Sequence, residues 1–260
     1  MSKMINGMAV TAALFAVSAS GLVAADAPPA EVTLIAKALP WVGAPSTPLP
    51  KSLLLQKNSQ IVAIGDSITY FGGYLRDSDA ALAKLYPALA LPKIINAGIG
   101  GHMAENLVAR FQKDVVDHQP AVVTISIGIN DVNLRLKAPP DEKILKAYQE
   151  NISKMVDLAQ RKGIKVILLT PTLIWEDPKG EGNKRLVQYV DAMKAVALDK
   201  KCGLADVHAM FLEALKHKPA NVGAWLTRDG IHLSPVGDAV MAIGVLRALG
   251  VPDQDLARLR

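Results

Sequence analysis

The sequence predicts a single α/β/α sandwich, in which helices cover both faces of a parallel β-sheet. The first observation is length: 260 residues suit one domain, because domains span roughly 100–200 residues and α/β folds often run longer. The second is composition, since 50% hydrophobic and 20% charged residues exclude a disordered chain and a coiled coil. The third is a regular alternation, from residue 60 onwards, of short apolar runs and longer helical stretches.

The short apolar runs are predicted to be strands. They span residues 60–64, 93–96, 121–127, 164–169 and 203–207. The stretches between them show helical spacing of apolar residues, as Met155, Leu158 and Ala159 illustrate. Helices are predicted over 74–86, 104–118, 140–161 and 182–200, with a last one over 236–249. Nearly continuous apolar strands indicate a parallel sheet buried on both faces and joined by right-handed crossovers.

Residues 1–25 are predicted to be a secretory signal peptide. Lys3 supplies a positive charge, an apolar run follows over 8–17, and Val23 and Ala25 fit a signal-peptidase site, with a second cut available after Ala27. The apolar run is too short for a membrane anchor, which needs roughly 20 residues. We therefore expect export to the periplasm or the extracellular space after cleavage near Ala25, with no stable membrane insertion.

Residues 26–55 are predicted to form a proline-rich extended arm ahead of the folded domain at 56–260. Six of the sixteen prolines lie between residues 26 and 50. Proline lacks the backbone donor that helices and central strands need. The arm should therefore run extended over the surface of the domain.

Charge and cysteine content exclude several classes of protein. The net charge of +5 comes from 29 basic and 24 acidic residues spread along the chain, so nothing in it indicates nucleic acid as a partner. One cysteine, Cys202, rules out a disulfide framework and a cysteine-based zinc site. We expect Cys202 to be a small buried hydrophobic residue.

In open parallel sheets, ligands bind beyond the carboxyl ends of the strands, and the first predicted strand is followed by Asp66 and Ser67. A glycine-led turn there would present Ser67 at a helix N-terminus, with its own backbone N–H unpaired. That placement suits a serine nucleophile. The alternative is that Asp66 or Ser67 only caps the helix, as both residue types commonly do.

Three glycines, Gly98, Gly100 and Gly101, follow the second predicted strand. Glycine lets a backbone amide approach a ligand closely. A dinucleotide-binding motif is the rival interpretation, but its third glycine would fall at residue 103, which is methionine. A flexible turn is the other alternative.

Polar residues also follow the third strand and precede the last helix. Asn130 offers a neutral side-chain donor suited to an oxyanion, although Asn130-Asp131 is also ordinary loop chemistry. Far along the chain, Asp229 and His232 are three residues apart, so the carboxylate can hold one imidazole nitrogen while the other faces a nucleophile.

Together these segments resemble the SGNH (GDSL) hydrolase superfamily, serine esterases and lipases of flavodoxin-like fold. The similarity covers about residues 60–249 and would make 56–260 one hydrolase domain with a five-stranded parallel sheet. The four blocks, in the family's order, are Gly65-Asp66-Ser67-Ile68, Asn96-Ala97-Gly98-Ile99-Gly100-Gly101, Gly128-Ile129-Asn130-Asp131 and Asp229-Gly230-Ile231-His232. Ile68 stands where the family's nickname has leucine.

The resemblance implies a role for each site residue. Ser67 would be the nucleophile, His232 the general base and acid, and Asp229 the group that orients the histidine. The oxyanion hole would consist of the Ser67 and Gly101 amides and the Asn130 side chain, with Gly100 as the one-residue alternative to Gly101. Asp66 and Asp131 would brace their loops, and no metal or cofactor would be needed.

The resemblance does not select a substrate. We expect a secreted esterase with an acyl-enzyme intermediate, acting on a small-molecule or polysaccharide ester as a carbohydrate O-deacetylase or short-chain acylesterase. A lysophospholipase or thioesterase and a catalytically idle carbohydrate-binding protein are the alternatives. Trp175 and Trp225 could stack on sugar rings or serve as packing anchors.

Overall fold

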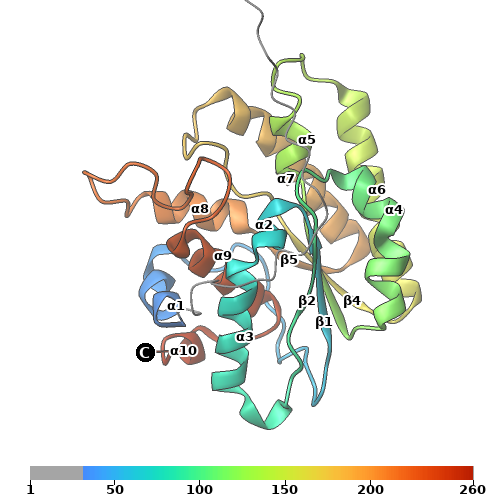
Figure 1. Ribbon diagram of the computed structural model, residues 1–260, viewed down its shortest axis with the longest axis vertical. Coiled ribbons are helices and arrows are strands. Elements are labelled where there is room, and N and C mark those ends of the chain that lie inside the picture. Colours follow the sequence, from blue (N-terminus) through green and yellow to red (C-terminus); the bar gives the residue numbers. More distant parts are fainter. Residues whose placement is uncertain (1–31, 260) are drawn as a thin grey trace, which may run out of the picture.

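The computed structural model describes residues 32–259, so the predicted signal peptide lies outside the described residues. A five-stranded, all-parallel sheet of order β2-β1-β3-β4-β5 stands at the centre (Figure 1). Its strands are β1 (Ile61–Gly65), β2 (Ile95–Gly98), β3 (Val122–Ser126), β4 (Lys165–Leu169) and β5 (Gly203–Ala205). The predicted fold class is therefore confirmed, and the strand order is that of flavodoxin-like proteins.

Two helical layers cover the sheet. In Figure 1, α3 (Gly73–Leu85) and α9 (Pro235–Ala248) lie on one side, where they contact each other, and α4 (Ala104–Asp114) and α6 (Glu142–Arg161) on the other. The long helix α7 (Glu181–Lys200) packs against α6, and α8 (Val207–Leu215) packs against α9. No helix among residues 32–259 is both long and apolar enough to cross a membrane.

The sequence explains the two types of helix. On α6, the buried residues recur at helical spacing on one face, at Tyr148, Ile152, Met155, Val156 and Ala159. The Asp141 side chain caps its first turn, and Gly163, at φ +71°, follows its end. Helix α9 is instead buried along nearly its whole length, which is the pattern of a helix enclosed by other elements.

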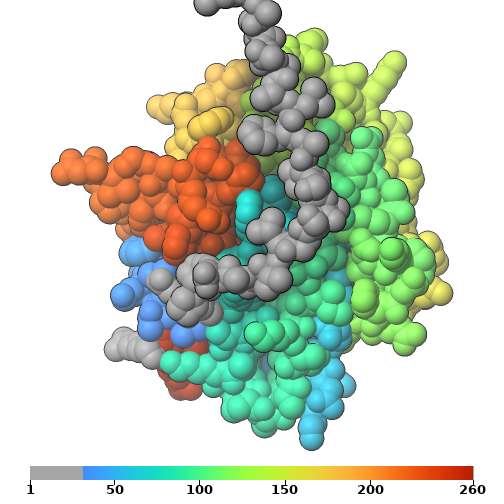
Figure 2. Space-filling model, viewed as in Figure 1, coloured from blue at the N-terminus to red at the C-terminus, as the bar shows by residue number. Residues whose placement is uncertain are grey.

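The prediction of an extended arm is wrong for residues 32–41. They form α1 (Val32–Ala38) and the short 3₁₀ helix η1 (Leu39–Trp41), in which Pro40 occupies an early position that needs no backbone donor. Ile35 is fully buried and α1 packs against α9. Figure 2 shows this blue segment packed beside the orange segment that contains α8.

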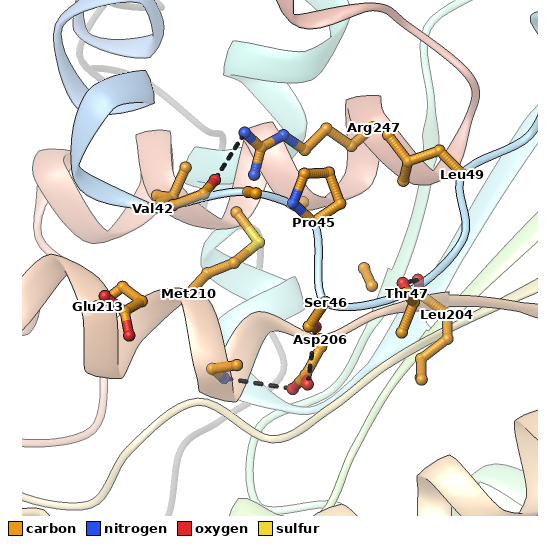
Figure 3. Close-up of a pocket in the computed structure, with 15 residues that line it drawn as sticks. Val42, Pro45, Ser46, Thr47, Leu49, Leu204, Asp206, Met210, Glu213 and Arg247 are labelled. Carbon is orange, nitrogen blue, oxygen red and sulfur yellow. Dashed lines mark hydrogen bonds between the residues drawn. The ribbon is translucent and has the colours of Figure 1, made fainter.

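Beyond η1 the arm has no regular structure but is held by side chains of the domain. The Arg247 guanidinium donates to the Gly43 carbonyl oxygen, and Ser46 Oγ donates to the buried Asp206 carboxylate (Figure 3). Between the arm and α8 and α9 lies a cavity of about 320 Å³. None of its lining residues belongs to the predicted site.

Three α-helices between residues 60 and 215 were not predicted from the periodicity. These are α2 (Ser67–Phe71), α5 (Ile129–Asn133) and α8. Helices of five residues, such as α2 and α5, are too short to show a repeating pattern of apolar residues. Both follow a strand directly and carry predicted site residues at their first turns.

Candidate active site

The predicted site residues meet at the carboxyl edge of the sheet. Strands β1 and β3 are neighbours in the sheet, although β2 lies between them in sequence. Ser67 follows β1 and Asn130 follows β3, so they flank the point at which the strand order reverses. This is where open α/β sheets bind ligands.

Ser67 is the first residue of α2, and its neighbour Asp66 caps that helix. The Asp66 side chain accepts a hydrogen bond of 2.9 Å from the Ile68 amide. Asp66 is buried, and burial raises the pKa of its carboxyl to about 7. Because Asp66 does the capping, the Ser67 hydroxyl is left for another contact.

Ser67, His232 and Asp229 form one hydrogen-bonded row. His232 Nε2 lies 2.9 Å from Ser67 Oγ, and His232 Nδ1 lies 2.6 Å from Asp229 Oδ2. The other Asp229 oxygen accepts from the amides of Ile231 and His232. Although burial alone would raise it, the pKa of Asp229 falls to about 2 because His232 and these amides hold the carboxylate. Such a row can transfer a proton between the serine hydroxyl and the imidazole.

A short hairpin holds Asp229 and His232 in place. The Arg228 amide donates to the His232 carbonyl oxygen, and Thr227 pairs with Leu233 in an antiparallel bridge. The Phe71 ring, on α2, packs edge-to-face against the imidazole with ring centroids 5.0 Å apart. The Arg228 guanidinium lies over the Phe71 ring. Sequence reasoning missed both residues, because the contacts of Phe71 with the imidazole and of Arg228 with Phe71 are made across the fold and leave no local signal.

The glycine loop approaches Ser67 and is joined to the Asn130 side chain. A Cβ at Gly100 would lie 3.9 Å from the Ser67 Cβ, and Gly101 takes a φ of +77°, which favours glycine. The buried Asn130 side chain donates one N–H to the His102 carbonyl oxygen at 3.0 Å. The Asn130 side chain is thus joined to the residue that follows the glycine loop.

Asp131 holds the start of α4. Its two carboxylate oxygens each lie 3.3 Å from the Ala104 amide, at the first turn of that helix. Burial raises the pKa of the Asp131 carboxyl to about 6. The glycine loop is consequently fixed at the end that leads into α4.

A buried glutamate, Glu176, is the main feature that sequence reasoning missed. Its side chain is 4% exposed and accepts hydrogen bonds from the amides of Trp225, Leu226 and Thr227, at 2.6–3.0 Å. The Thr227 hydroxyl and Lys218 Nζ complete its contacts. Burial would raise the pKa of this carboxyl, but the donors outweigh it and the pKa lies below its usual value. Glu176 therefore anchors the segment 225–227 that leads into the Asp229–His232 hairpin.

The structure distinguishes the two tryptophans that the sequence left open. Trp225 is half-buried and packs on Trp41, with ring centroids 5.2 Å apart, so it is a packing residue. Trp175 is 65% exposed.

Cys202 is half-buried, and burial raises the pKa of its thiol to about 11, which leaves it unreactive. Among residues 32–259, no group of three or more potential ligand side chains is placed to hold a metal ion.

A hydrogen-bonded triad of serine, histidine and aspartate at the sheet edge of an α/β sandwich is the arrangement of a hydrolase. A family model described as the GDSL-like lipase/acylhydrolase family matches residues 63–240. The chain belongs to this family, as the four sequence blocks predict, and it is a carboxylic ester hydrolase.

Individual relatives agree with this assignment. An acetylxylan esterase from Geobacillus stearothermophilus is 30% identical over 210 residues, which cover 74% of this chain and 94% of the relative. An arylesterase from Vibrio mimicus is 27% identical, with 69% of this chain and 82% of the relative covered. The crystal structure of an α/β hydrolase enzyme from the metagenome of Lake Arreo, Spain, superimposes with a TM-score of 0.68 at 30% identity, and covers 77% and 99% of the two chains.

Proposed function

We propose that the chain is an exported serine esterase that works through an acyl-enzyme intermediate and removes acetyl or other short acyl groups, with O-acetylated carbohydrate as its preferred substrate. The observation that carries the proposal is the row Ser67–His232–Asp229, with contacts of 2.9 and 2.6 Å. A carbohydrate-binding protein on the same scaffold would have no use for a base paired with both a hydroxyl and an orienting carboxylate.

The chemistry follows from this row. Ser67 Oγ attacks the ester carbonyl carbon while His232 Nε2 takes its proton, and the protonated imidazole then returns that proton to the departing alcohol. Water, deprotonated by the same nitrogen, releases the acid from Ser67. Asp229 stabilises the imidazolium that forms in each half of the reaction.

We propose that three hydrogen-bond donors stabilise the negatively charged oxygen of each tetrahedral intermediate. They are the backbone amides of Ser67 and Gly101 and the second N–H of the Asn130 amide. The first N–H of Asn130 is already used by His102, which orients the side chain before substrate binds. Preorganised donors of this kind cost no reorganisation at the moment of reaction.

Two observations support the substrate and the location. The acetylxylan esterase relative is named for an acetylated carbohydrate, and the first 25 residues have the pattern of a signal peptide. Hydrolysis of p-nitrophenyl esters from acetate to decanoate, by the chain from residue 26, tests the acyl preference. We expect activity to peak at acetate or butyrate, whereas a peak at the long chains would favour a lipid acylhydrolase instead.

Replacing Asn130 by alanine is expected to lower kcat by about 10²- to 10³-fold, because one oxyanion donor is lost. KM should change little, since the negative charge develops only after binding. Steady-state kinetics on p-nitrophenyl acetate measure both constants. Asn133→Ala, at the last residue of the same helix, is the matched control and should retain activity. Equal losses in the two variants would contradict the assignment of Asn130.

Replacing Glu176 by glutamine is expected to lower kcat by about 10- to 100-fold, because small displacements of catalytic groups have effects of this size. Both oxygens of Glu176 accept from the Trp225 amide, so the glutamine NH₂ would oppose an N–H donor in either orientation. The effect should nearly vanish in a His232→Ala background, where the position of the hairpin no longer matters.

Glu213, which is half-exposed and within residues 32–259 forms an ion pair only with Lys216, provides the control for this substitution. Glu213→Gln should leave kcat unchanged. If Glu176→Gln lowered the activity of the wild-type and His232→Ala backgrounds by the same factor, Glu176 would act on stability alone.

A further inference from the structure

We propose that the open face of the Trp175 indole is a stacking surface for the ring of the ester's alcohol part, a pyranose ring in an O-acetylated carbohydrate. The inference deepens the proposed function and rests on it. It concerns a residue outside the four sequence blocks, on the loop that follows β4.

The orientation of the indole follows from its contact with Gly230. A Cβ placed on Gly230 would lie 2.2 Å from Trp175 Cε3, and 2.6 and 2.8 Å from the two ring atoms bonded to Cε3. The two neighbouring ring atoms are only slightly farther from the Gly230 Cβ position than Cε3 is. A point beyond the ring edge would be much farther from them, so the Cβ position lies above the ring plane. One face of the indole therefore lies on Gly230, and the opposite face is open in a residue that is 65% exposed.

The indole is fixed before any substrate arrives. Trp175 and Glu176 adopt φ values of +61° and +48°, which are unfavourable for residues other than glycine. The Trp175 amide donates to the Gly230 carbonyl oxygen at 2.7 Å, and the Glu176 carboxylate is held by the hydrogen bonds described above. A pre-positioned aromatic ring loses little conformational freedom when it binds a ligand.

The indole also lies on the correct side of the reaction centre. In the proposed mechanism the alcohol departs with a proton from His232, so the alcohol part of the substrate must lie beside that histidine. Gly230 is two residues from His232, so their Cα atoms are at most about 8 Å apart. The carbonyl oxygen, in contrast, faces the Gly101 and Asn130 donors of the proposed oxyanion hole.

The surroundings favour a sugar ring over an aryl ring. A pyranose has an apolar face of C–H groups, which can stack on the indole, and an edge of hydroxyl groups, which need polar partners. The exposed side chain of Arg228, two residues before Gly230, offers a guanidinium donor to such a hydroxyl group. All three tryptophans of the chain lie in the described part, and the other two pack on each other.

The test compares full-chain protein and its Trp175→Ala and Trp175→Phe variants on three acetate esters. An acetylated methyl β-xyloside carries a sugar ring, phenyl acetate carries an aryl ring, and ethyl acetate carries no ring. We expect Trp175→Ala to lower kcat/KM for the xyloside by about 3- to 12-fold, chiefly through KM, as the usual strength of aromatic contacts implies. The effect on ethyl acetate should stay below about 2-fold, and phenylalanine should restore most of the loss.

Leu198, exposed on α7, supplies the control variant Leu198→Ala. Equal losses on the three esters, or no loss on the xyloside, would overturn the inference while Ser67-dependent hydrolysis left the esterase proposal standing. A selective loss on phenyl acetate would overturn the choice of a pyranose. A wild-type chain that hydrolysed ethyl acetate but not the xyloside would overturn the carbohydrate preference itself. Binding of the xyloside to Ser67→Ala protein, with and without Trp175, measures the contact independently of turnover.

Discussion

Ser67→Ala is expected to lower kcat by about 10⁶-fold, the size of effect seen when a serine nucleophile is removed from a serine, histidine and aspartate set. The other groups cannot replace it. His232 would retain its contact with Asp229 but would have no hydroxyl within reach to deprotonate. Hydrolysis of p-nitrophenyl acetate, followed with enough enzyme to detect the residual rate, measures the loss.

The fold should survive this substitution, because Ser67 is only partly buried and its cap is supplied by Asp66. Near-ultraviolet circular dichroism and the melting temperature should match those of the wild type. Ser153→Ala, on α6 away from the site, should keep full activity. Labelling by a fluorophosphonate, read by intact mass, should occur in the wild type and the Ser153→Ala variant only. A labelled or fully active Ser67→Ala protein would show that another residue is the nucleophile.

The residues of the site were recognisable because each one is tied to a local pattern. Ser67, Gly101 and Asn130 each follow a predicted strand within a few residues, and a parallel sheet brings the carboxyl ends of its strands to one edge. Asp229 and His232 are close in sequence, so a turn is enough to join them. The remaining step, from one hairpin to a serine far away in sequence, depended on the family resemblance.

Glu176 could not be found in this way, and for Trp175 the sequence left ring stacking and packing open as alternatives. Glu176 acts through the amides of Trp225, Leu226 and Thr227, some fifty positions away, and amides carry no sequence signal. The left-handed backbone at both residues is likewise unexpected, because neither residue type favours it. A glycine is required at position 230 because a Cβ there would collide with the Trp175 indole, but the sequence does not show which residue imposes this requirement.

The start of the chain shows the opposite limit. Proline content predicted an extended arm, yet residues 32–38 form a helix that contains no proline. The average composition of the segment hid a short apolar stretch whose burial against α9 stabilises the helix. Tertiary packing therefore decided a structure that local composition did not.

Asp229→Asn is expected to lower kcat by about 10⁴-fold while the hairpin keeps its shape. An asparagine can still accept from the Ile231 and His232 amides through its carbonyl oxygen. Its NH₂ would then face His232 Nδ1 and donate to it, which places the ring proton on Nε2, opposite Ser67 Oγ. In that tautomer the imidazole cannot accept the serine proton.

Asp229→Asn removes the carboxylate charge at every pH, whereas acid removes it only near the pKa of Asp229. With its pKa at about 2, Asp229 stays ionised throughout the range of about pH 5 to 8 in which histidine titrates. Lowering the pH of the wild type across that range therefore does not neutralise Asp229. In the Asp229→Asn variant, kcat should remain low even at the upper end of the range. Asp141→Asn is the control, because asparagine caps a helix as well as aspartate does. Substantial activity in Asp229→Asn would mean that His232 is oriented by its contacts with Phe71 and the hairpin alone, and that the carboxylate is dispensable.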